Sequence, residues 1–125
     1  MTENDIAHAV LGSALTVHRH LGPGLLESVY EEVLVYEIEL RGLQCARQVP
    51  VPIKYQAVQF AVGFRADIIV ERSVILELKS VETVLPVHKK QLLTYLRLTD
   101  LRLGLLINFN VPLLRDGFSR IVNGL

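Results

Sequence analysis

The sequence predicts an α/β fold in which a mixed β-sheet is flanked by helices. Apolar residues recur at helical spacing over residues 3–41, whereas runs rich in Val and Ile dominate residues 44–79. A further helical segment over residues 86–99 precedes a strongly apolar strand. The order therefore indicates two N-terminal helices, a β-hairpin core and a strand–helix–strand crossover, all within one domain over residues 1–125.

Two helices are expected at the start of the chain, over residues 3–20 and 25–41. Between them, Gly22 suits a left-handed position after a helix, and Pro23 cannot continue one. Gly42 is expected to end the second helix.

The next segment is expected to form two strands. The first covers residues 44–55 and contains Pro50 and Pro52, which favours an edge position because proline cannot donate a backbone hydrogen bond. The second covers residues 58–62, and Gly63 is expected to let the chain bend into the following hairpin.

The hairpin over residues 64–79 is the centre of the prediction. Two apolar runs flank a polar loop at residues 71–73, and three charged residues interrupt them: Asp67, Glu77 and Lys79. A three-residue loop aligns Asp67 with Glu77, whose Cβ atoms would then lie about 4.5–5.5 Å apart. Two carboxylates this close repel, and a hard cation such as Mg²⁺ removes the conflict. Lys79 shares a face with Glu77 and adds a positive donor. Alternatively, Asp67 caps a turn, Glu77 pairs with Lys79, and the face is solvated.

Three further polar residues have two readings each. Glu27 lies in the first turn of the second helix, where a carboxylate also simply complements the helix dipole. Gln91 and Tyr95 are four residues apart on the third helix and share a face. They either reach the charged end of the hairpin or are a solvent-facing Gln and a core Tyr.

The last third of the chain completes the sheet. Pro86 suits the first position of a helix over residues 86–99. Residues 101–109 read as a buried strand, parallel to its neighbour because a helix precedes it. Residues 113–125 are expected to form a small terminal strand or an extended tail packed on the sheet.

Composition narrows the classes of function. The chain has 125 residues, of which 50% are hydrophobic and 21% charged, and thirteen basic residues balance thirteen acidic ones. The neutral balance provides no overall field for nucleic acid. A single cysteine, Cys45, excludes an intrachain disulfide and a zinc-finger-type site. No signal-peptide-like segment opens the sequence and no run of about 18 apolar residues occurs, so a cytoplasmic location without membrane contact is expected.

The scattered motifs together resemble one known family. Gly24-Leu25-Leu26-Glu27-Ser28-Val29-Tyr30 fits the Gly-x-x-Glu-x-x-Tyr pattern of the GxxExxY protein family. Five further segments also resemble that family: 47–50, 64–67, 77–79, 91–95 and 104–109. The resemblance therefore covers essentially the whole chain. The family is placed in the PD-(D/E)XK nuclease superfamily. The resemblance therefore implies a restriction-endonuclease-like mixed sheet flanked by helices.

The resemblance also implies roles for individual residues. Asp67 and Glu77 match the acidic metal ligands and Lys79 the motif lysine. Glu27 matches the helix acid near the metal site in RecB-like nucleases, and Gln91 and Tyr95 match a Gln-x-x-x-Tyr element that orients groups around the active centre. The implied reaction is phosphodiester hydrolysis with Mg²⁺ or Mn²⁺ held by Asp67, Glu77 and the Leu78 carbonyl, and by Glu27 directly or through water.

The expected partner is nucleic acid, with DNA favoured. The candidate backbone contacts are the basic residues Arg47, Lys54, Arg65, Lys89 and Lys90. A solvated basic face is the other reading of the strand residues in this set. Two other classes of function stay open: a catalytically silent nuclease-fold module that binds or regulates, and a structural subunit of a homo-oligomer.

Overall fold

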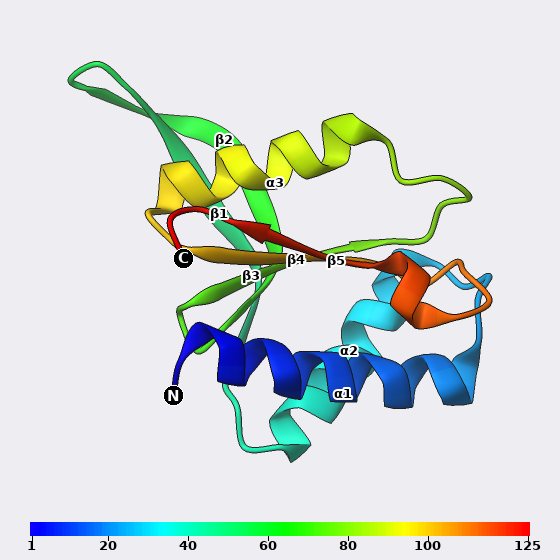
Figure 1. Cartoon of the computed structure of the whole chain (residues 1–125). Helices are drawn as coiled ribbons and strands as arrows, with labels where there is room; N and C mark the ends of the chain where they lie inside the picture. Colours follow the sequence, from blue (N-terminus) through cyan, green and yellow to red (C-terminus); the bar gives the residue numbers. More distant parts are fainter.

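The computed structural model describes residues 1–125, apart from the side chain of Val62. A mixed five-stranded sheet lies at its centre, with strand order β1-β2-β3-β4-β5. Helices α1 and α2 cover one face of the sheet and α3 covers the other (Figure 1). The predicted class, a mixed sheet flanked by helices with two helices first, is confirmed.

The two N-terminal helices form close to the predicted positions. Helix α1 spans Glu3–Leu21, and Thr2 caps it by a reciprocal hydrogen-bonded box with Asp5. Helix α2 spans Glu27–Leu40 and has no side-chain cap at its start. Both bury apolar stripes against the sheet in the larger of two hydrophobic clusters.

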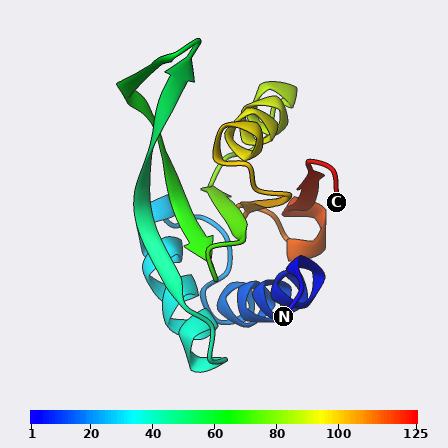
Figure 2. The ribbon, with the colours of Figure 1, turned by 90° about the vertical axis from the view of Figure 1, so that its left-hand side faces the viewer.

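Strands β1 (Cys45–Tyr55) and β2 (Val58–Val70) pair antiparallel, and β1 is an edge strand as the prolines predicted. The prediction that a bend at Gly63 separates two strands was wrong. The chain continues through this point as one thirteen-residue strand, and the pairing register shifts between Pro52 and Ile53 instead. The outer part of this hairpin rises beyond the rest of the molecule (Figure 2).

The remaining strands follow the predicted crossover. Strand β3 (Val74–Lys79) pairs antiparallel with β2 and parallel with β4 (Leu103–Asn108), and α3 (Pro86–Thr99) connects them. Gly104 lets α3 approach β4 closely, because a Cβ there would lie 2.9 Å from the Leu92 side chain. A short 3₁₀ turn (Leu114–Gly117) leads into β5 (Phe118–Val122), the expected terminal strand, which pairs antiparallel with β4.

None of the helices in the described residues is long and apolar enough to cross a membrane.

Candidate active site

The β2–β3 hairpin has the predicted register. Its loop is the three residues Glu71–Ser73, and the pairs nearest the loop are Val70 with Val74 and Ile69 with Ile75. The last backbone pair is Ile68 with Leu76, so the same register carried one residue further sets Asp67 opposite Glu77.

Asp67 binds the main chain of the neighbouring strand. The backbone N–H of Leu78 donates a hydrogen bond to Asp67 Oδ2 at 2.8 Å. This bond holds the carboxylate against β3. It satisfies the Leu78 N–H beyond Ile68 and Leu76, the last backbone pair of the two strands. The alternative in which Asp67 caps a turn is therefore not what the structure shows.

Glu77 is the most perturbed acid of the hairpin. Its side chain is 9% exposed, and Oε1 is buried without a hydrogen-bond partner among the described residues. Burial, followed by the negative charge of Asp67, raises the pKa of Glu77 to about 8, and the positive charge of Lys79 offsets only part of this. Two converging carboxylates with an unpartnered oxygen are typical of a site that a cation completes.

The donor set fits a hard divalent cation. Mg²⁺ keeps several waters and is commonly held by one or two carboxylates, so Asp67, Glu77 and the Leu78 carbonyl are of the right chemical type. In the described part of the chain, no three His, Cys, Asp or Glu residues gather closely enough to hold a metal by themselves. The candidate centre is therefore a two-carboxylate one.

Glu27 lines the same cavity as Asp67. It is the first residue of α2, is exposed, and lines a cavity of about 380 Å³ together with Asp67 and Leu78. Glu27 was expected to reach the metal either directly or through water. Its exposed position on the Asp67 side of the molecule favours contact through water.

Lys79 and Tyr95 approach the acids from different elements. Lys79 is half-buried at the end of β3, and its carbonyl accepts a hydrogen bond from the Phe109 N–H at 3.0 Å. The Tyr95 ring stacks on Phe64 with centroids 3.5 Å apart. Burial and then the charges of Glu77 and Asp67 raise the pKa of Tyr95, so its hydroxyl lies within electrostatic range of the pair. Gln91 lies one turn earlier on α3 and is exposed.

The five basic residues predicted to contact the nucleic-acid backbone lie on β1, β2 and α3. Arg47 is engaged with α2, where Nη2 donates to Glu31 at 3.0 Å and to Glu32 at 2.8 Å. Arg65 Nη1 donates to the Gln48 carbonyl at 3.4 Å. The other members, Lys54 on β1 and Lys89 and Lys90 on α3, are exposed.

Two side chains that support the site were missed in the sequence. Glu31 is 7% exposed, accepts hydrogen bonds from Arg47 and Gln48, and lines the same cavity as Glu27. Its spacing of four residues from Glu27 was the available signal, because such residues share a helix face.

Tyr30 is the second of these, and its contacts explain the last position of the Gly-x-x-Glu-x-x-Tyr pattern. It is fully buried and its ring stacks on Phe109. Its hydroxyl donates to the Gly22 carbonyl at 2.5 Å and accepts from the Leu25 N–H at 3.2 Å. Ser80 Oγ donates to the carbonyl of the same Leu25 at 2.6 Å. The loop that leads into Glu27 is thus held between Tyr30 and the residue after Lys79.

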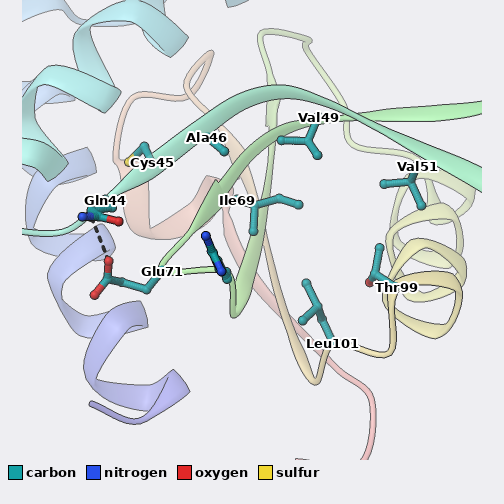
Figure 3. Close-up of a pocket in the computed structure, with 10 residues that line it drawn as sticks. Gln44, Cys45, Ala46, Val49, Val51, Ile69, Glu71, Thr99 and Leu101 are labelled. Carbon is teal, nitrogen blue, oxygen red and sulfur yellow. Dashed lines mark hydrogen bonds between the residues drawn. The ribbon is translucent and has the colours of Figure 1, made fainter.

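A larger cavity of about 610 Å³ lies elsewhere (Figure 3). Val49, Val51, Ile69 and Thr99 are among its lining residues, and at one end the Gln44 N–H donates to Glu71 at 2.9 Å. Neither Asp67 nor Glu77 lines it, whereas Asp67 lines the smaller cavity, so the candidate centre is at the smaller one.

Comparison with protein families identifies the class that this fold and this acid pair define. A model described as the PD-(D/E)XK nuclease superfamily matches residues 4–121, and the chain belongs to that superfamily. Its members usually hydrolyse phosphodiester bonds and generally use divalent metal ions. Neither the search of curated proteins nor that of solved structures found a match.

Proposed function

We propose that this protein is a Mg²⁺- or Mn²⁺-dependent nuclease of the GxxExxY type, acting on nucleic acid, with DNA favoured, as a single domain. The observation that carries the proposal is the buried Glu77 Oε1 without a partner beside the Asp67 carboxylate. A buried acid whose pKa is raised to about 8 by burial and by a second carboxylate is a ready ligand for a cation.

Each residue of the centre has a role that follows from its position. Asp67, Glu77 and the Leu78 carbonyl would hold the cation, and Glu27 would reach it through water. A bound divalent cation polarises the phosphate and lowers the pKa of a bound water. The Lys79 ammonium offsets negative charge that develops on the phosphate, and the hydrogen bond from Leu78 keeps Asp67 aimed at the site. Tyr95 and Gln91 orient groups from the α3 side.

The test removes charge and keeps shape. Asp67→Asn retains an oxygen that accepts from the Leu78 N–H, and Lys79→Met retains much of the alkyl stem. Both changes should abolish metal-dependent cleavage of a labelled oligonucleotide, while the circular dichroism spectrum stays unchanged. Calorimetry should show Mg²⁺ or Mn²⁺ binding in wild type and in Lys79→Met, and no binding in Asp67→Asn.

The matched control is Glu82→Gln, which neutralises an exposed acid three residues after Lys79. It should cleave like wild type. Cleavage that survives Asp67→Asn would assign the activity to another site. Wild type that binds no cation would favour the silent module, and light scattering that shows a stable oligomer independent of nucleic acid would favour the structural subunit.

A further inference from the structure

The outer part of the β1–β2 hairpin, here called the arm and comprising residues 51–64, has apolar pairs on both sides of the register shift between Pro52 and Ile53. The pairs Val51–Phe64, Ile53–Phe60 and Tyr55–Val58 lie directly opposite one another on the two strands. Directly paired residues, and residues two apart on a strand, point to the same face. The alternate pair Lys54–Gln59 belongs to the other face.

The outer part of this face is open to solvent. The exposed fractions are 39% for Ile53, 63% for Tyr55, 55% for Val58 and 45% for Phe60. The arm rises clear of the body of the molecule, so these side chains are not part of either hydrophobic cluster (Figures 1 and 2). An exposed apolar face of this kind marks an interaction surface.

The face leads to the candidate active centre. At its inner end Phe64 stacks on Tyr95 with an interplanar angle of 5°. Phe64 lies three residues before Asp67 on β2, and the charges of Glu77 and Asp67 act on Tyr95, so the stacked pair lies on the side of the arm nearest the acid site. We call Tyr55, Phe60, Phe64 and Tyr95 the aromatic track. These are four of the eight Phe and Tyr residues of the chain, which has no Trp.

The charge around the arm selects the kind of partner. No Asp or Glu occurs in residues 40–66. The one charged residue of the arm is Lys54, on the opposite face of the hairpin, and Arg65 follows the arm directly. Only positive charge therefore flanks the track on the arm, which suits a polyanion. Two copies of the arm could form no ion pair with each other, because the arm carries no acid.

The small charge and the large aromatic surface of the arm favour single-stranded over duplex nucleic acid as its ligand. Duplex binding depends mainly on many phosphate contacts, and the arm, with Lys54 as its one charged residue, offers few. Stacking of unpaired bases on aromatic rings needs less charge and tolerates any sequence. We propose that the arm binds single-stranded nucleic acid by stacking bases on the aromatic track, so that the strand is directed to the Asp67–Glu77 centre. The part of this inference that directs the bound strand to the Asp67–Glu77 centre rests on the proposed nuclease function.

The experiment measures binding without cleavage. Fluorescence anisotropy in EDTA compares a labelled mixed-sequence single strand with the duplex of the same sequence. Wild type should bind the single strand at least tenfold more tightly. Tyr55→Leu and Phe60→Leu keep an apolar side chain and remove the ring, and each should weaken single-strand binding by about 5- to 150-fold. Tyr55→Trp, which keeps an aromatic ring, should bind the single strand as tightly as wild type.

The matched control is Tyr36→Leu, which removes an equally exposed ring from α2 (62% exposed). It should leave binding unchanged. Equal or tighter duplex binding, or full affinity in Tyr55→Leu, would overturn the proposal. A dimer in light scattering that dissociates in Tyr55→Leu would also overturn it, in favour of a second copy as the partner. Because EDTA removes the cation, this experiment measures binding alone. A negative result would therefore not contradict metal binding or cleavage, and a lack of cleavage would not contradict binding by the arm.

Discussion

Glu77→Gln should stabilise the metal-free protein while it removes metal binding. Glu77 has a pKa of about 8 in the folded protein against an ordinary value of 4.5. Between these values the unfolded chain has lost a proton that the folded protein still binds, so the free energy of unfolding falls as pH rises, by up to about 1.4 kcal/mol per pH unit. The total is about 5 kcal/mol above pH 8 and about 3 kcal/mol at pH 7. Glutamine resembles the protonated acid in shape and does not titrate.

The assay is urea unfolding in EDTA at several values between pH 4.5 and pH 8.5. The stability of Glu77→Gln minus that of wild type isolates the Asp67–Glu77 pair, because acids remote from the pair titrate alike in both proteins. The difference should be smallest near pH 4.5 and should grow with pH. Added Mg²⁺ should stabilise wild type above pH 7, by about 2.7 kcal/mol at a concentration 100 times the Kd, and should leave the variant unchanged.

The exposed Glu82 supplies the control, since Glu82→Gln should give a flat difference over the same range. A flat difference for Glu77→Gln would refute the reasoning, because it would mean that the folded protein accommodates the charged acid without a cation.

Three further changes test the structure around the centre. Tyr30→Phe keeps the ring stacked but leaves a carbonyl and an N–H of the loop before α2 unbonded. It should cost about 1–3 kcal/mol in urea unfolding and speed amide exchange in that loop, and Tyr36→Phe should do neither. Arg47→Ala leaves the buried Glu31 without its cation, so a loss of about 1–3 kcal/mol is expected at pH 7; a loss below 0.5 kcal/mol would contradict the role of the pair. Gly104→Ala forces α3 away from β4 and should lower stability by about 1–3 kcal/mol, which an unchanged melting temperature would disprove.

The local pattern of the sequence determined most of the architecture. Helix boundaries followed from apolar spacing and from the Gly22-Pro23-Gly24 break, and the three-residue loop of the β2–β3 hairpin set its register. The edge position of β1 followed from its prolines, and the parallel pairing of β3 with β4 followed from the intervening helix. These features depend on periodicity and on backbone chemistry, which are properties of neighbouring residues.

The sequence also predicted that Asp67 and Glu77 come together, and in the structure the charge of Asp67 acts on Glu77. It did not show that β2 runs unbroken through Gly63, because a register shift against the partner strand depends on how two strands meet. Nor did it show that Glu31 binds Arg47, which joins residues from a helix and a strand.

Tertiary packing alone decided the electrostatics of the centre. The raised pKa of Glu77 comes first from burial, and burial depends on every element packed around the sheet. In the same way, the aromatic track exists only because α3 brings Tyr95 onto Phe64, thirty-one residues apart in the chain. The sequence by itself therefore determined which residues carry charge and in which order they pair along the strands. Desolvation and contact between distant elements, which no local pattern contains, decided what those residues meet.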